Sequence, residues 1–124
     1  MAKVLVLGAG VAGHTAALLL KRRLKKNHEV IVISPNSKYQ WIPSNIWVGV
    51  GRMTTEQVTF DLKQVYDKQK IKFHQAKAIS INPQGDKSRK PFVSFEYTSM
   101  ENKGQAGYEE FDYLVNATGP KLKF

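Results

Sequence analysis

The sequence predicts an α/β fold: a parallel sheet with helices packed on it, and an antiparallel β excursion near residues 79–113. Two short apolar runs, at residues 4–7 and 30–33, are typical of strands that are buried on both faces. Between them, apolar residues at 16–20 and at Leu24 form the broad face of a helix that ends in basic residues. Strand, helix and strand in this order predict a parallel βαβ unit over residues 3–34.

The remaining elements follow from shorter patterns. Apolar residues at helical spacing predict a helix over residues 60–69, and alternating apolar and polar residues predict strands at 71–81 and 92–97. A last strand is expected at 111–115, with polar loops at 83–90 and 99–107. Residues 35–58 contain prolines, glycines and three aromatic residues, which predicts a long irregular loop with a functional role.

Length and composition narrow the classes of protein. We expect the 124 residues to form a single domain, 1–124. We also expect this domain to be truncated, because the sequence ends shortly after the last strand, before any element that could complete a site at the end of that strand. The chain has no cysteine, no transmembrane run and no signal peptide, and we expect it to be soluble. Its net charge of +9 is densest at residues 21–26. This cluster is interpreted as a solvated helix end. The alternative is a contact with a membrane surface or a partner, and binding of nucleic acid is not expected.

A glycine motif carries the main functional signal. Gly8, Gly10 and Gly13 match G-x-G-x-x-G between the first strand and the helix. In Rossmann-like folds the first glycine permits a tight turn, the second admits a pyrophosphate, and the third lets the helix pack close to the sheet. The pyrophosphate then lies on the free amides of the helix N-terminus. The motif predicts dinucleotide binding, and the alternative is a glycine turn that only packs the βαβ unit.

The end of the second strand departs from this fingerprint. An acidic residue is expected there to bind the ribose hydroxyls, but the chain has Ser34. Glu29 lies at the start of the strand and cannot serve instead. A serine hydroxyl forms a weaker bond to a ribose than a carboxylate does. Ser34 is therefore either a ribose ligand or an ordinary turn residue.

Two further segments resemble a known family. Residues 34–51, with Pro-Ser-Asn-Ile-Trp-Val-Gly-Val-Gly at 43–51, resemble the segment after the second strand of sulfide:quinone oxidoreductases, which are flavoproteins with two dinucleotide-binding domains. The ending Ala-Thr-Gly-Pro-Lys-Leu at 117–122 is similar to the second flavin motif of that family. Members of the family tend to carry serine at the Ser34 position. The resemblance covers nearly the whole chain and is weakest at residues 83–107.

The resemblance implies FAD as the cofactor and a role for particular residues. The positions that would bind FAD are Gly8, Ala9, Gly10, Val11, Ala12, Gly13, Ser34, Pro35, Lys77, Ala78, Thr118 and Gly119. The positions that would approach the flavin ring and the sulfide pocket are Pro43, Ser44, Asn45 and Trp47. Each of these groups has a simpler alternative, namely core packing for Ala78, loop packing for Trp47, and a turn for Thr118–Gly119.

The resemblance also implies what the chain lacks. In the family, cysteines oxidise sulfide, and the full-length enzyme passes electrons through FAD to a membrane quinone as a peripheral membrane protein. Without cysteines the fragment is expected to be inactive alone, and no catalytic residue is assigned. His14 is expected to face a phosphate or solvent, and the three histidines predict no metal site. The alternatives are a fragment of a type II NADH:quinone dehydrogenase, or a small regulatory module that senses NAD or another nucleotide.

Overall fold

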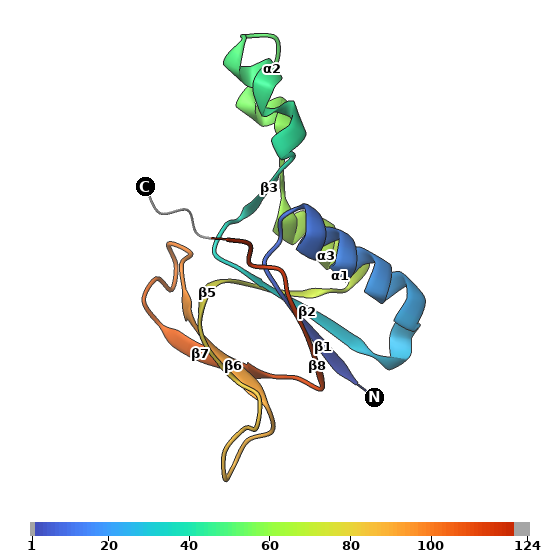
Figure 1. Cartoon of the computed structure of the whole chain (residues 1–124), viewed down its shortest axis with the longest axis vertical. Coiled ribbons are helices and arrows are strands. Elements are labelled where there is room, and N and C mark those ends of the chain that lie inside the picture. Colours follow the sequence, from blue (N-terminus) through green and yellow to red (C-terminus); the bar gives the residue numbers. More distant parts are fainter. Residues whose placement is uncertain (1, 121–124) are drawn as a thin grey trace.

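A computed structural model describes residues 2–120 and confirms the mixed α/β fold. A six-stranded sheet has the order β7-β6-β5-β2-β1-β8, and a separate two-stranded sheet pairs β3 with β4. Pairings β1–β2, β1–β8 and β2–β5 are parallel, whereas β5–β6 and β6–β7 are antiparallel. The predicted antiparallel excursion is therefore present, and it curls away from the parallel strands (Figure 1).

The elements follow the chain in a simple order. The strands are β1 (Lys3–Leu7), β2 (Glu29–Ser34), β3 (Lys38–Gln40), β4 (Thr59–Asp61), β5 (Lys72–Asn82), β6 (Phe92–Tyr97), β7 (Ala106–Glu110) and β8 (Tyr113–Asn116). The α-helices are α1 (Val11–Leu24), α2 (Asn45–Gly49) and α3 (Leu62–Gln69), and the 3₁₀ helices are η1 (Lys25–Asn27), η2 (Ile42–Ser44) and η3 (Thr55–Val58). None of the helices within residues 2–120 has the length and apolar character needed to cross a bilayer.

Alternate residues of the central strands pack into two hydrophobic cores, one on each face of the sheet. Leu5 and Ile31 point to one face, where β6 supplies Val93 and Phe95. Their neighbours Val6 and Val32 point to the other face, where helices α1 and α3 cover the sheet. Both faces are buried, which explains why β1 and β2 are apolar at nearly every position.

Helix boundaries and the last strands differ in part from expectation. The structure adds β7, Ala106–Glu110, which was not predicted as a separate strand and which overlaps the end of the polar loop expected at 99–107. Helix α3 begins at Leu62 rather than at residue 60, because residues 59–61 pair with β3 as strand β4. The last strand is shifted to Tyr113–Asn116.

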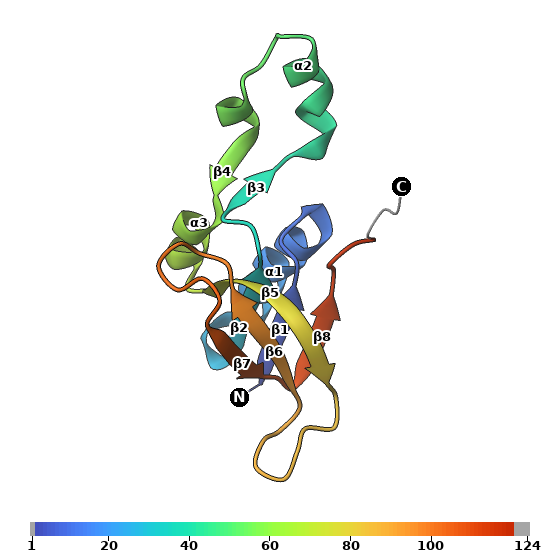
Figure 2. The same ribbon diagram turned by 90° about the vertical axis from the view of Figure 1, so that its left-hand side faces the viewer.

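The segment expected to be an irregular loop instead contains short strands and helices and projects from the sheet. We call residues 37–61 the arm; it rises from the end of β2 and returns to α3 (Figure 2). Its root is the antiparallel pair β3–β4, in which Tyr39 lies opposite Phe60. Its tip contains η2, α2 and η3. Trp41, Ile42, Ile46, Trp47 and Val50 expose apolar side chains on this tip.

Candidate functional site

The glycine loop joins β1, α1 and β8 through very close backbone packing. Gly8 has φ +92°, and a Cβ atom on it would lie 2.4 Å from the carbonyl oxygen of Ala117. A Cβ atom on Gly13 would lie 2.1 Å from the carbonyl oxygen of Gly8. Gly8 and Gly13 are thus required for the tight turn and the close helix, as the motif predicts.

Gly10 differs from these two glycines. A Cβ atom on Gly10 would meet no other atom within 4 Å, so folding does not require glycine there. Its amide and those that follow lie at the N-terminus of α1, where unpaired N–H groups favour an anion. The open space beside Gly10 belongs to a groove, which leaves room for a ligand to approach the backbone.

This groove lies at the carboxyl ends of β1, β2 and β8 and has a volume of about 980 Å³. The strand order reverses at β1. Strand β2, which follows β1 in the chain, pairs with one edge of β1, and the much later strand β8 pairs with the other edge. Ligands of open α/β sheets bind at such a switch point. The groove is also at the upper end of the size range of small-molecule and cofactor sites.

Most of the residues predicted to bind a cofactor meet in this groove. It is lined by Gly8, Ala9, Gly10, Val11, Ala12, Ser34, Pro35, Lys77, Ala78, Thr118 and Gly119. Gly13 lies behind the loop and does not line it. The last two residues of the 117–122 motif, Lys121 and Leu122, lie outside the described residues.

The residues expected beside a flavin ring do not line the groove. Pro43, Ser44, Asn45 and Trp47 all lie on the arm. Ser44 is buried and donates its hydroxyl proton to the carbonyl oxygen of Trp41 at 2.8 Å, so it stabilises the arm itself. Asn45 accepts a hydrogen bond from Gln40, also at 2.8 Å.

One wall of the groove was not predicted from the sequence. Residues 36–38, Gln40, Ile42 and Thr59 line it from the root of the arm, and Ile33, Ala76 and Ala117 line it from the sheet. None of these was assigned a role in binding, since they reach the groove through the pairing of β3 with β4 or through the sheet. The aromatic character of residues 35–58 was the only available signal.

The charges around the groove favour an anionic ligand. Lys38 and Lys77 are the charged residues in its lining, and no carboxylate among residues 2–120 joins them there. The first turn of α1 also lacks an acidic residue that would compete for its amides. Ser34 is buried, and its hydroxyl oxygen accepts a hydrogen bond from the amide of Asn36 at 3.3 Å.

The expectation that His14 faces a phosphate or solvent is wrong. Its side chain is buried, and its Nδ1 atom lies 2.8 Å from the hydroxyl of Tyr66 on α3. Burial lowers the pKa of His14. His14 does not line the groove, and its ring points to α3 instead.

The other two histidines have structural partners. His28 accepts a hydrogen bond from the amide of Ala2 at 3.0 Å. His74 lies 2.8 Å from the carboxylate of Glu109 through Nε2, and its Nδ1 lies 3.1 Å from the Tyr97 hydroxyl. No group of histidine, aspartate and glutamate side chains within residues 2–120 is arranged to hold a metal ion.

The strand order, the glycine loop and the groove together define a Rossmann-like domain of the FAD/NAD(P)-binding type. Over its whole length the chain is 33% identical to the sulfide-quinone reductase of Aquifex aeolicus (strain VF5). This confirms the resemblance to sulfide:quinone oxidoreductases that the sequence indicated. The chain spans about a quarter of that relative, 26% of its length. No protein-family model matches the chain.

Solved structures agree with this result. The chain superimposes on the sulfide:quinone oxidoreductase of Aquifex aeolicus with a TM-score of 0.79 and 31% identity, covering all of this chain and 26% of that one. NDH2 of Plasmodium falciparum in complex with NADH gives a TM-score of 0.77 at 18% identity, over 98% of this chain and 23% of NDH2. Reduced CoADR-RHD of Bacillus anthracis gives 0.79 at 16% identity, over 99% and 21%. The last two likenesses show the fold alone.

Proposed function

We propose that this chain binds the ADP half of FAD, as the N-terminal portion of a flavoprotein that oxidises sulfide and reduces a membrane quinone. The groove carries the proposal, because it combines open space at Gly10, a helix N-terminus and two lysines without a carboxylate. The identity to the Aquifex sulfide-quinone reductase supports the choice of FAD, sulfide and quinone over other nucleotides and substrates.

Particular residues would hold the cofactor. The amides of residues 9–12 would bind the pyrophosphate, because a helix N-terminus and closely spaced amides suit an anion. The hydroxyl of Ser34 and the backbone of Pro35 would contact the ribose, and Lys77 and Ala78 would lie beside the adenine. Thr118 and Gly119 would lie on the flavin side. Bound FAD supplies a ring that accepts two electrons, and the protein supplies placement and electrostatics.

The chain has no cysteine, so the cysteines through which this family oxidises sulfide would have to come from elsewhere in a longer protein. We therefore expect this chain alone to be inactive as a sulfide oxidase, and quinone and membrane contacts to belong to the full-length enzyme. Pro43, Ser44, Asn45 and Trp47 would approach the flavin ring from the arm only as part of that assembly.

Calorimetric titration of the 124-residue chain with ADP, FAD, NAD and ATP tests the nucleotide proposal. We expect ADP and FAD to bind. Gly10→Val should weaken both at least tenfold, because its side chain would occupy the space meant for the pyrophosphate while the fold remains intact. Gly49→Ala is the matched control, since Gly49 lies on the arm, also has open space around it, and is absent from the groove lining.

Two results would contradict the proposal. Tight binding of NAD or ATP without affinity for ADP or FAD would favour a nucleotide-sensing regulatory module. Undiminished binding of FAD by the Gly10→Val variant would place the cofactor elsewhere. Ser34 favours the sulfide alternative, because sulfide:quinone oxidoreductases tend to carry serine at this position.

A further inference from the structure

The arm forms one wall of the groove, so the position of the arm sets the shape of the groove. Lys38, Gln40 and Thr59 line the groove from strands β3 and β4, at the root of the arm. The glycine loop and the first turn of α1 form the facing wall. Whatever holds the arm against α1 therefore also holds the two walls together.

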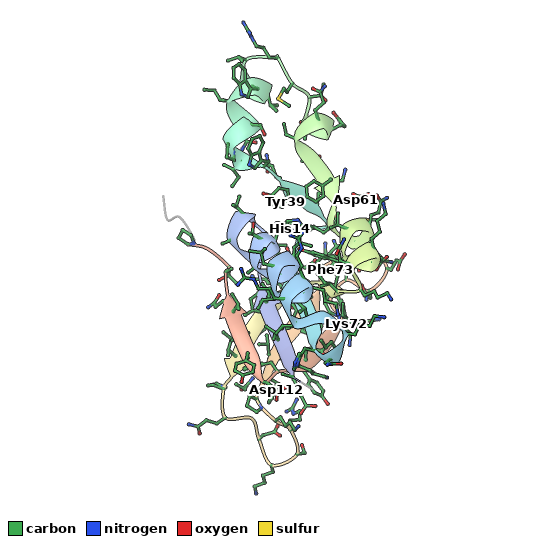
Figure 3. The ribbon with its side chains drawn as sticks, turned by 90° about the vertical axis from the view of Figure 1, so that its right-hand side faces the viewer. His14, Tyr39, Asp61, Lys72, Phe73 and Asp112 are labelled. Carbon is green, nitrogen blue, oxygen red and sulfur yellow. The ribbon has the colours of Figure 1, made fainter. Side chains whose placement is uncertain are left out.

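His14 supplies that connection. Its ring lies 4.8 Å from the ring of Tyr39 and 5.5 Å from the ring of Phe60, measured between ring centroids. Tyr39 and Phe60 stack on each other at 4.8 Å across the β3–β4 pair. Figure 3 shows His14 on the upper part of α1, beneath Tyr39. One side chain from the first turns of α1 thus packs against both strands of the arm root.

A hydrogen bond between His14 and Tyr66 accompanies this packing. Tyr66 is completely buried, and burial raises the pKa of its hydroxyl, which therefore remains protonated. The Tyr66 hydroxyl can then donate its proton to Nδ1 of a neutral His14. A protonated imidazole carries hydrogen on both nitrogens, so its Nδ1–H would instead donate to the Tyr66 oxygen, and the cost of protonation lies in burying the charge.

The surroundings of His14 disfavour the protonated form. The titratable residues that face it are Tyr66 on α3, through its hydroxyl, and Tyr39 on β3, through its ring, while β4 contributes the uncharged ring of Phe60. No ion pair within residues 2–120 involves His14. The positive end of the α1 dipole lies on the same turns and also opposes a positive charge.

We propose that His14 is a pH-dependent positioning residue that holds the arm, and with it one wall of the groove, against α1 when its imidazole is neutral. Protonation places a charge with no ionic partner among the described residues in this buried contact, and it therefore favours release of the arm root, where water can solvate the imidazolium. Since the folded protein binds this proton less readily than an unfolded chain does, the hold is complete above about pH 6.5 and is lost as the pH falls below it.

Tryptophan fluorescence can follow the arm without any ligand, so the test does not depend on what the groove binds. Both tryptophans of the chain, Trp41 and Trp47, lie on the arm. At about pH 7.5 their anisotropy should decay mainly at the tumbling rate of the whole chain. As the pH is lowered, a fast component should grow, with a midpoint below about 6.5, the ordinary pKa of a histidine.

Four variants separate this role from simple packing. His14→Ala should show the fast component at both pH values. The double variant His14→Phe, Tyr66→Phe keeps the rings and removes both polar groups, so it should show the fast component at neither pH. His28→Gln is the matched control, because His28 lies elsewhere in the fold, against the amide of Ala2, and this variant should behave as the original chain does. Tyr66→Phe alone should weaken the hold at neutral pH.

A pH transition that persists in the double variant, or a His14→Ala arm as rigid as the original, would overturn the proposal. If a variant fails to fold, the imidazole of His14 can be titrated in the original chain by NMR. A midpoint below about 6.5 that coincides with the fluorescence transition supports the role of His14. A midpoint at or above that value, or one that leaves the tryptophan signal unchanged, refutes it.

Discussion

Single glycines of the loop have separable tasks. Gly8 combines a positive φ with tight surroundings, because a Cβ atom on it would lie 2.4 Å from a backbone oxygen, whereas Gly49 has open space. Gly8→Ala should therefore lower the free energy of unfolding by at least about 1–3 kcal/mol, the usual cost of a strained backbone position. Gly49→Ala should change it by less than about 1 kcal/mol. Urea unfolding followed by circular dichroism measures both, and equal effects would mean that the Gly8 turn adapts.

His14 shows where residue-level inference from sequence fails. The glycine motif is local, so its position before a helix was enough to place residues 8–12 at a groove. The partners of His14 come from residues 39, 60 and 66, which are far from it in the chain. A histidine in the first turns of a helix gives no local sign of such partners. Burial against distant segments could not be predicted from the sequence.

At the scale of elements, one buried carboxylate joins β7 to its neighbours. Glu109 on β7 lies 3.2 Å from Lys72 and 2.8 Å from His74 on β5, and 3.6 Å from Lys3 on β1. Burial alone would raise the pKa of Glu109, but the His74 hydrogen bond and the Lys72 charge outweigh it and lower the pKa to about 2.

This network predicts how stability depends on pH. Because the pKa of Glu109 is lower in the folded protein, its contribution is complete above about pH 4.5 and is lost as the pH falls toward 2. Glu109→Gln should lower the free energy of unfolding at neutral pH by about 1–3 kcal/mol and flatten its pH dependence in the acid range. Glu101→Gln, in the exposed loop before β7, is the control. Thermal melts from acid to neutral pH measure this, and parallel curves for the two variants would contradict it.

The same strand shows which kind of element gives no local signal in the sequence. β7 reads Ala-Gly-Tyr-Glu-Glu, which contains a glycine and two acids and resembles a loop. It is a strand because β6 offers a pairing edge and because Lys3 and Lys72 offset the charge of Glu109 while His74 hydrogen-bonds to it. By contrast, β1 and β2 could be predicted, since burial on both faces leaves an apolar run that is visible locally.

At the scale of the whole molecule, the core and the tip of the arm are nearly independent. The two apolar cores lie on the faces of the sheet, and the strongly exposed apolar side chains of the arm belong to neither. The amide of Trp41 donates a hydrogen bond to the carbonyl oxygen of Val58 at 3.1 Å, so a two-residue turn could close the β3–β4 pair at this point.

We therefore expect that replacing residues 42–57 with Asn-Gly leaves the sheet intact. The melting temperature should change by less than about 8 °C, equivalent to roughly 1 kcal/mol in a domain of this size. Removal of the exposed apolar side chains should also reduce self-association in sedimentation experiments. Loss of the cooperative melting transition would show that the arm tip stabilises the sheet.

The position of β8 beside β1 also governs how fast this chain can fold. β1 precedes the other strands of this sequence, and its second neighbour β8 is separated from it by most of the chain. The hydrogen bond from the amide of Lys3 to Asp112, just before β8, spans a sequence separation of 109. Closing so long a loop is entropically slow, and non-local strand pairing places folding in the range of about milliseconds to seconds. During synthesis, β1 and β2 must wait on the ribosome with one edge of their sheet exposed until β8 emerges, which makes the partly made chain the form most open to aggregation.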